Sequence, residues 1–514
     1  MRLVKGGKKN VFRVIFGRST IIVLLLALQM GGLFALSLYL ENYTPLIYGG
    51  QTLIVIVAEI YLLNTRQNPT MKLTWCILVA VVPVFGILLY IFNKLDLGHR
   101  ASRYVQRVIM RETVRYIPDQ SELMASLERE DKALHNLAAY TQSCGWPVYA
   151  GSTVKYFPDG ETKLAELIYQ LKRAEKYIFL EYFIIEEGYM WGSVLKVLLR
   201  KARAGVNVRV MYDGTCSFTR LPRSYPSKLE ELGIKCKVFA PIYPFVSTSY
   251  NNRDHRKIVV IDGETAFTGG INLADEYVNR KQPYGKWKDT AVMVQGDAVQ
   301  SFTWMFLQLW NASERERVYE PYLLPSPPVK GAAGCVIPYA DSPLDGEQTA
   351  ELVYLDIINR AQDYLYIMTP YLILDNELVT ALGYCARRGV DTRIILPHIP
   401  DKKYAFLLAK THYRELMDAG IKIYEYTPGF VHAKMFICDD REAVVGTVNL
   451  DYRSLYLHFE CGLYMKEVPV LQDIWQDFSD TMAESQLVTV ADLKAEKRIN
   501  KLFAWLLKVV APLM

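Results

Sequence analysis

The chain carries one residue pattern twice, and this duplication restricts the folds that it can adopt. Residues 164–213 and 352–396 each predict a helix, a strand, a second helix and a second strand, because the spacing of their apolar residues changes from helical to continuous. The copies lie much farther apart than the ~20 to 50 residues of a solenoid repeat. They therefore indicate two copies of an α/β domain, in which helices cover a largely buried β-sheet.

Both copies contain the pattern H-x-K-x-x-x-x-D, with an apolar run after the lysine. Its members are His255, Lys257 and Asp262 in the first copy and His432, Lys434 and Asp439 in the second. Side chains two residues apart in a strand point to the same face, so the histidine and the lysine of each copy face one pocket. One such pattern alone would be weak support for chemistry. Two copies in matching frames predict one shared active site at the seam between the domains.

Further polar residues follow each motif at matching positions. They are Gly270, Asn272 and Asp289 in the first copy and Thr447, Asn449 and Glu460 in the second. The asparagine and threonine side chains and the glycine backbone can donate hydrogen bonds to a phosphate oxygen. We expect Asp289 to bind Nδ1 of His255. We expect Glu460 to do the same for His432, since a carboxylate there fixes the tautomer and frees Nε2 for chemistry.

Charge and cysteine content add little to the functional prediction. The net charge is only +5, so the total charge does not indicate a nucleic-acid partner. The eight cysteines are dispersed, without C-x-x-C or zinc spacing, and are expected to be reduced thiols. The other histidines have no matching frame and are expected to be surface or structural residues: His99, His135, His398, His412 and His458.

Three hydrophobic stretches precede the first domain. Residues 19–40 contain no charge and match the ~20 residues that a helix needs to cross a bilayer. A cleaved signal peptide is the alternative, but the stretch is too long and lacks a clear small-residue cleavage site. Residues 46–63 and 73–92, the latter with Pro83 and Gly86, look like a helical hairpin. We therefore predict two to three transmembrane helices.

The basic residues around these stretches leave the number of crossings open. They flank the first stretch on its N-terminal side and recur after the third. Three crossings would place the two groups on opposite sides of the membrane, against the positive-inside rule. Either one stretch is re-entrant or interfacial, or the later basic residues form a surface helix. These later residues are Lys94, Arg100, Arg103, Arg107 and Arg111.

The C-terminal residues predict a basic amphipathic helix. Such a helix suits an anionic membrane surface, and docking on the domains is the alternative. Its apolar residues are Ile499, Leu502, Phe503, Leu506 and Val510, and its basic ones are Lys494, Lys497, Arg498, Lys501 and Lys508.

Over about residues 148–490, the paired motifs resemble the phospholipase D superfamily. In that family one histidine attacks phosphorus to give a phosphohistidine intermediate, and the other protonates the leaving alcohol. The resemblance implies that lysines and asparagines neutralise the phosphate charge, with no metal and no cofactor. The family commonly has Gly-Ser where this chain has Gly269-Gly270 and Gly446-Thr447, so the site is asymmetric. Either histidine remains a candidate for the attacking one.

Longer phrases resemble bacterial cardiolipin synthases within this superfamily. Examples are HRKIVVIDGETAFTGGINLADEY, TPYLILDNEL and GFVHAKMFICDDREAVVGTVNLDYRSL, together with residues 64–90. The resemblance implies transfer of a phosphatidyl group from one phosphatidylglycerol to the primary hydroxyl of another, with release of glycerol. It also implies anionic membrane lipid, and not nucleic acid, as the partner, and a multi-pass location in the bacterial plasma membrane.

Other functions remain compatible with the motif. They are hydrolysis by water, phosphatidyl transfer that uses another alcohol or phosphatidylethanolamine, and a non-enzymatic membrane scaffold. The scaffold is disfavoured, since it would not need both motifs intact.

The expected fold class is α/β, with two phospholipase D-like domains that share one active site behind N-terminal transmembrane helices. Each domain is expected to be a β-sheet flanked by helices. The expected segments are 1–18 (basic), 19–95 (membrane anchor), 96–147 (connector), 148–320 (first domain), 321–334 (linker), 335–490 (second domain) and 491–514 (basic amphipathic helix).

Overall fold

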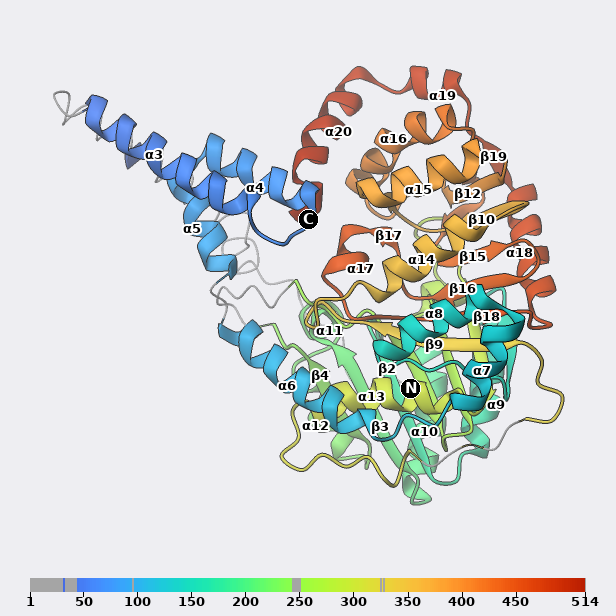
Figure 1. Ribbon diagram of the computed structural model, residues 1–514. Coiled ribbons are helices and arrows are strands. Elements are labelled where there is room, and N and C mark those ends of the chain that lie inside the picture. The colour runs from blue at the N-terminus through green and yellow to red at the C-terminus, as the bar shows by residue number, and fades with distance from the viewer. Residues whose placement is uncertain are drawn as a thin grey trace. The chain divides into compact units, whose positions relative to one another are not determined.

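A computed structural model describes residues 31–32, 44–94, 97–242, 251–323, 326 and 329–513, and Figure 1 shows its elements. The chain divides into two compact units. The larger unit contains mainly Ala101–Ile242 and Tyr250–Leu507, and the smaller contains mainly Lys5–Arg100 and Lys508–Met514. Each unit has hydrophobic clusters of its own.

The first half of the larger unit is built on a seven-stranded sheet in the order β1-β8-β6-β5-β2-β3-β4. β2, β3 and β4 run parallel, and the other neighbours are antiparallel. The strands are β1 Ser152–Phe157, β2 Tyr177–Tyr182, β3 Asn207–Asp213, β4 Lys235–Phe239, β5 Lys257–Ile261, β6 Thr265–Gly269 and β8 Ala291–Gly296. The helices are α9 Gly160–Arg173, α10 Tyr189–Arg203, α11 Gly214–Thr219, α12 Tyr225–Glu230, the 3-10 helix η3 Asp275–Val278 and α13 Val299–Asn311.

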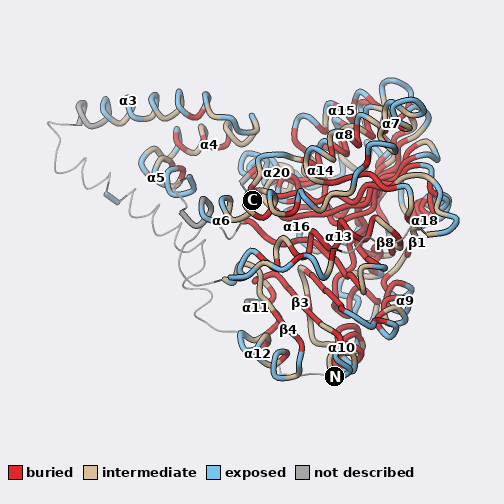
Figure 2. Tube along the Cα trace, turned by 60° about the horizontal axis from the view of Figure 1, so that its bottom comes forward, coloured by how far each residue is buried: buried red, intermediate tan, exposed pale blue. Residues whose placement is uncertain are grey.

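Helices cover both faces of this sheet, which explains why its central strands are apolar on both sides. Phe179 and Val260 belong to a hydrophobic cluster that includes α13. Leu180 and Val259 belong to another cluster, which includes α9 and α10. Successive side chains of a strand alternate between the two faces, so this division follows from strand geometry. Figure 2 shows the central strands as buried and the surrounding helices as partly exposed.

The second half repeats this topology. Its eight-stranded sheet has the order β19-β13-β12-β10-β15-β16-β18-β9, and from β9 onward seven strands match the order of the first sheet. The predicted duplication of an α/β domain is confirmed. The strands are β9 Cys335–Asp341, β10 Tyr364–Met368, β12 Asp391–Pro397, β13 Lys422–Tyr426, β15 Met435–Cys438, β16 Glu442–Gly446, β18 Glu460–Lys466 and β19 Ser485–Leu487, with the short pair β11 Leu372–Ile373 and β17 Leu450–Asp451. The helices are α14 Thr349–Arg360, α15 Asn376–Arg387, α16 Lys403–Asp418, α17 Tyr452–Tyr456 and α18 Leu471–Ala483.

The two halves are joined by strand pairing as well as by a shared core. One hydrophobic cluster contains residues of both sheets. The short strand β7, Lys286–Lys288, pairs in parallel with β14, Gly429–Val431, of the other half. Asp254 likewise forms a parallel bridge with Phe459. Each half therefore supplies backbone that fixes the motif region of the other.

The residues between the hydrophobic stretches and the first sheet are helical. The helices are α6 Leu97–Val114, α7 Ser121–Glu130 and α8 Lys132–Ser143. Leu134, Leu137 and Ala138 of α8 belong to the main cluster of the larger unit. This part of the predicted connector is therefore packed into the core.

The smaller unit contains α3 Thr44–Leu63, α4 Pro69–Val81 and α5 Pro83–Lys94. The predicted single helix over residues 73–92 is wrong, because the chain breaks at Val82, where φ is −134° and ψ is 73°. Pro83 has no N–H and disfavours helical geometry at the residue before it. Gly86 lets α5 approach α4 closely, since a Cβ there would lie 2.8 Å from the carbonyl oxygen of Leu78.

Among the described residues, no helix has both the length and the apolar character of a membrane span. The predicted span 19–40 lies outside the described residues, apart from Gly31 and Gly32. The three helices of the smaller unit nevertheless expose large apolar side chains (Figure 2). They include Leu53, Ile54, Val57, Ile60 and Leu63 on α3 and Leu73, Ile77, Val81, Val84 and Leu88 on α4 and α5.

The C-terminal residues form α19 Val490–Ala495, α20 Arg498–Val510 and the 3-10 turn η4 Ala511–Leu513. The predicted C-terminal helix is confirmed as a helix. Of the described side chains of α20, only Ala504 is buried, whereas Leu502, Phe503 and Leu506 are exposed. A cavity of about 460 Å³ lies between α16 and the helices α19 and α20. The apolar face of α20 is therefore not packed on the domains.

Candidate active site

The two motif histidines lie at the seam between the halves. His255 directly precedes β5, and His432 lies between β14 and β15. Both are buried, with 6% and 7% of their surface exposed. The backbone N–H of His255 donates to the carbonyl of Phe459 at 2.9 Å, and that of His432 donates to the carbonyl of Lys288 at 2.6 Å. Each histidine is therefore held by the backbone of the opposite half.

Each histidine also binds a carboxylate from the opposite half. Nδ1 of His255 lies 2.9 Å from Oε1 of Glu460. Nδ1 of His432 lies 2.6 Å from Oδ2 of Asp289. The predicted pairing, with the carboxylate and the histidine in the same half, is wrong. The cause is structural: Asp289 follows β7 and Glu460 follows the Phe459 bridge, so each continues a backbone segment that crosses the seam.

These carboxylates set the state of both imidazoles. A carboxylate at Nδ1 keeps the proton on that nitrogen and leaves the lone pair on Nε2. Burial lowers the pKa of His255 and of His432 well below the usual value, so both rings are neutral near pH 7. Burial raises the pKa of Asp289 to about 6, although Lys434 and Lys257 act in the opposite direction. Two neutral imidazoles with free Nε2 atoms therefore share one buried site.

The motif lysines bring positive charge to the same place. Nζ of Lys257 donates to the carbonyl of His255 at 2.5 Å, and Nζ of Lys434 donates to the carbonyl of His432. Nζ of Lys434 also lies 2.8 Å from Nδ1 of His432. Burial lowers the pKa of Lys257 to about 8 and that of Lys434 to about 7. The arrangement suits an anion, because a bound phosphate would stabilise both ammonium groups.

Gly270 and Thr447 support the carboxylates. The N–H of Gly270 donates to the carbonyl of Thr290 at 2.9 Å, and a Cβ on Gly270 would lie 2.0 Å from Oδ1 of Asp289. The hydroxyl of Thr447 donates to Oε2 of Glu460. The expectation that these two groups donate to phosphate is therefore wrong. The glycine is required, because the carboxylate of Asp289 fills the space that a side chain would need.

The two motif asparagines differ in their partners. Oδ1 of Asn272 accepts the N–H of Ile184 at 2.9 Å, and its Nδ2 donates to the hydroxyl of Tyr277 at 2.8 Å. Oδ1 of Asn449 is buried without a hydrogen-bond partner in the described part of the chain. Asn272 therefore fixes the backbone after β2, whereas Asn449 keeps capacity for a ligand.

The motif aspartates lie at the opposite ends of their strands from the histidines. Asp262 accepts three backbone N–H groups at the start of β2, at 2.7 to 2.8 Å. Asp439 accepts three at the start of β10, at 2.8 to 2.9 Å. Both have positive φ, at 55° and 53°. The prediction that they are catalytic is wrong, because their carboxylates are used to tie one strand to the next.

Replacing Asp262 by alanine should therefore destabilise the fold rather than the chemistry. The change removes three charge-assisted hydrogen bonds, so we expect a loss of about 2 to 4 kcal/mol in the free energy of unfolding. Chemical denaturation measures this loss, and Asp439→Ala is the matched change in the other half. A variant of unchanged stability that had lost most of its activity would show that Asp262 takes part in the reaction.

Sequence reasoning missed His458 and a buried ion cluster. His458 was expected to be a surface or structural residue, but its ring lies 5.6 Å from that of His255. Its position two residues before Glu460 was the available signal. Behind His255, Nε of Arg256 donates to Glu181 at 2.6 Å. A lone carboxylate within the apolar strand β2 was the signal for that pair.

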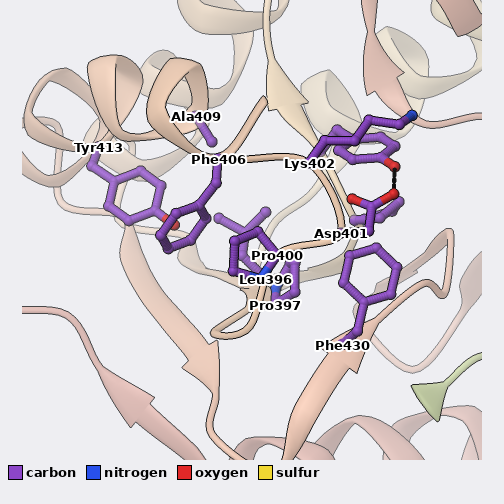
Figure 3. A pocket seen from close by; sticks show the side chains of 11 residues that line it. Leu396, Pro397, Pro400, Asp401, Lys402, Phe406, Ala409, Tyr413 and Phe430 are labelled. Carbon is purple, nitrogen blue, oxygen red and sulfur yellow. Dashed lines mark hydrogen bonds between the residues drawn. The ribbon is translucent and has the colours of Figure 1, made fainter. Parts of the chain in front are cut away.

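A small pocket borders the aromatic residues beside His432. Phe430 lies 5.8 Å from the His432 ring and lines a cavity of about 10 Å³, room for roughly one water. Tyr371 donates to Asp401 at 2.7 Å, and the ammonium of Lys402 lies 4.8 Å from the Tyr371 ring. Figure 3 shows Asp401 and Lys402 together at one side of this pocket. The pocket is too small for a lipid, but Lys402 adds positive charge near His432.

One group of metal-ligand atoms occurs at this site in the described part of the chain. Atoms of His255, His458 and Glu460 lie within 4.8 Å of one another. However, Nδ1 of His255 already donates to Glu460. The trio is therefore a hydrogen-bonded pair with a third imidazole beside it.

Known proteins share both the sequence and the fold of this unit. The family described as "Cardiolipin synthase, PLD-like domain" matches residues 167–310 and 354–482, and "Phospholipase_D-nuclease N-terminal" matches residues 53–92. A protein of Alkalihalophilus pseudofirmus named cardiolipin synthase is 32% identical over 472 residues, which cover 90% of this chain and 93% of that protein. A Streptococcus mutans protein without a named function is 50% identical over 461 residues, which cover 90% of this chain and 100% of that protein.

The fold also matches a solved structure. The crystal structure of phosphatidylserine synthase from Haemophilus influenzae has a TM-score of 0.57 at 16% identity, and the match covers 74% of this chain and 97% of that one. At this identity the match shows a common fold.

Proposed function

The chain belongs to the cardiolipin synthase family of phospholipase D-like proteins, and on this premise we propose that it transfers a phosphatidyl group from one phosphatidylglycerol to another. The products are cardiolipin and glycerol. The observation that carries the proposal is the pair of buried imidazoles at one seam, each with a carboxylate on Nδ1. This arrangement suits a reaction in which one imidazole attacks and the other moves a proton.

The reaction consists of two displacements at phosphorus. In the first, Nε2 of one histidine forms a bond to phosphorus and the bond to the glycerol oxygen breaks. The second histidine, protonated at Nε2 in the presence of the anionic substrate, gives its proton to that oxygen. In the second displacement the same histidine takes the proton of the incoming hydroxyl, whose oxygen forms the new bond to phosphorus and releases the first histidine.

Positive charge stabilises the phosphorus oxygens throughout. Lys257 and Lys434 hold their ammonium groups at the two histidines, and Asn449 has a buried amide with unused hydrogen-bonding capacity. Groups fixed in advance in a dry site stabilise developing charge without reorganisation. We assign these three side chains to the phosphate.

A product assay with phosphatidylglycerol as the sole lipid tests this function. Purified full-length protein should convert it to cardiolipin and glycerol in equal amounts. Phosphatidic acid as the main product would identify a hydrolase. A reaction that started only after addition of another alcohol or of phosphatidylethanolamine would identify a different acceptor.

The covalent intermediate has its own test. If glycerol leaves before the acceptor reacts, the enzyme should exchange labelled glycerol into phosphatidylglycerol in a ping-pong cycle. Rapid denaturation during turnover should trap lipid phosphate on one histidine, as an acid-labile phosphoramidate. Peptide mapping then identifies His255 or His432. Absence of both exchange and trapped phosphate would indicate direct displacement.

We expect kcat/KM to depend on pH through buried groups with shifted pKa values. Below about pH 6, protonation of Asp289 removes the acceptor that orients His432. Above pH 7 to 8, Lys434 and then Lys257 lose the charge that binds phosphate, because burial lowers their pKa. The profile should therefore be bell-shaped, and kcat/KM reports the free enzyme. An undiminished kcat/KM at pH 9.5 would contradict these roles.

We propose that the smaller unit embeds in the bacterial plasma membrane. Its described helices expose apolar side chains over a wide surface, which soluble surfaces rarely do. α4 and α5 have 13 and 12 residues, which at 1.5 Å per residue fall short of the ~30 Å hydrocarbon core. We assign them to a re-entrant hairpin. The remaining two stretches then make two crossings, which puts both groups of basic residues on one side.

Membrane extraction checks this assignment. Full-length protein should stay with membranes after washing with high salt and alkaline carbonate, and detergent should release it. Removal of residues 1–95 should release much of the protein, while the exposed apolar face of α20 retains a fraction. Release of the intact chain by salt alone would contradict the membrane assignment.

A further inference from the structure

His458 is a third imidazole at the site, and the mechanism above does not use it. It is buried, with 9% of its surface exposed, and its backbone N–H donates to the carbonyl of Arg453 at 2.9 Å. Neither ring nitrogen has a hydrogen-bond partner among the described residues. Nδ1 lies 3.7 Å from Oε1 of Glu460, which is too far for a hydrogen bond. The ring is therefore fixed in place with both polar atoms free.

Such a group is costly unless a ligand completes it. A buried polar atom without a partner costs roughly 1 to 3 kcal/mol, so most buried polar side chains are paired. The carboxylate of Glu460 accepts from His255 and Thr447, and it is not a partner for His458. The unpaired imidazole thus stands beside the reacting histidine and not in an unrelated part of the core.

The chemistry of the ring indicates which ligand group it suits. A neutral imidazole donates from one nitrogen and accepts at the other, and a hydroxyl has the same two capacities. A phosphate only accepts, and the site already offers it Lys257 and Lys434. An ammonium only donates. A hydroxyl is therefore the group that can use both capacities of this imidazole.

We propose that His458 binds a hydroxyl of the glycerol headgroup beside His255 and thereby selects a polyhydric alcohol over water as acceptor. The proposal rests on the proposed function, since it concerns the alcohol of that reaction. In the first displacement His458 holds a hydroxyl of the leaving glycerol that does not react. In the second it holds the corresponding hydroxyl of the incoming headgroup, so that the reacting hydroxyl points to phosphorus.

Glycerol exchange measures this role directly. His458→Phe removes both polar atoms at similar ring size, and it should raise KM for glycerol by about 10-fold, the effect of one to two lost hydrogen bonds. It should also shift the products toward phosphatidic acid. His458→Gln keeps a donor and an acceptor and should restore most of the preference for transfer. His412→Gln, at a buried histidine on α16, is the matched control and should behave as the unmodified protein.

A second measurement needs no variant. The unmodified enzyme should use glycerol at least about 10-fold better than 1-propanol, because the monohydric alcohol lacks the hydroxyl for His458. Equal use of the two alcohols, or an unchanged KM and product ratio in His458→Phe, would overturn the proposal. Failure of the unmodified protein to make cardiolipin would instead overturn the proposed function.

Discussion

His255→Ala and His432→Ala should each abolish cardiolipin formation. Proton transfer alone contributes ~10²- to 10⁴-fold, and loss of the nucleophile removes the covalent route altogether. The double variant should be no slower than the slower single variant, because residues that act as a unit are not additive. Initial rates with phosphatidylglycerol measure the effect. His135→Ala, at an exposed histidine of α8, is the control.

A substrate with a good leaving group separates the two histidines. A p-nitrophenyl phosphodiester needs no proton on its leaving oxygen, so the variant without the proton-transferring histidine should still release a burst of p-nitrophenol and trap phosphate on the enzyme. The variant without the nucleophile should do neither. Near-normal turnover of phosphatidylglycerol by either folded variant would rule out a shared site.

Glu460→Gln and Asp289→Asn should be nearly as damaging. A carboxylate that orients a catalytic imidazole is worth up to ~10⁴-fold in rate when an amide replaces it, because the amide favours the wrong tautomer. Each change also places an amide next to a buried ring that its carboxylate now holds at 2.9 Å or 2.6 Å. We expect a loss of roughly 10³- to 10⁴-fold in kcat with little change in stability.

Nuclear magnetic resonance tests which carboxylate serves which ring. The nitrogen shifts of His255 should change tautomer in Glu460→Gln and stay unchanged in Asp289→Asn. His432 should respond in the reverse way. Thr447→Val offers a milder control, since it removes the hydroxyl that donates to Glu460 and keeps the carboxylate. Responses within one half would contradict the crossed pairing.

The order of elements was predictable from the sequence because it depends on local patterns. The apolar periodicity of residues 164–213 and 352–396 reports burial of the strands, and burial follows directly from helices on both faces. The break at Val82 was also within reach, since Pro83 disfavours a helix at the residue before it. The prediction gave more weight to the apolar content of residues 73–92 than to this local rule.

The partners of the site residues were not predictable in the same way. Which carboxylate meets His255 depends on how β7 and β14 pair across the seam, and no pattern within one half encodes that pairing. Asp262 shares a motif with His255, but a strand of extended residues separates them, so shared sequence did not mean shared location. His458 was missed because the motif frame was the only criterion for the histidines.

The crossed histidine–carboxylate pairs mean that the halves cannot change independently. Gly270 leaves room for Asp289, and Asp289 in turn sets the proton on His432. A substitution in the first half is thus felt as a change of basicity in the second, and the converse holds through Thr447 and Glu460. A half expressed alone would carry an imidazole without its counter-ion, so activity should reappear only when both halves are present together. For the same reason, chimaeras that join halves of diverged relatives should fail more often than chimaeras with exchanged N-terminal helices.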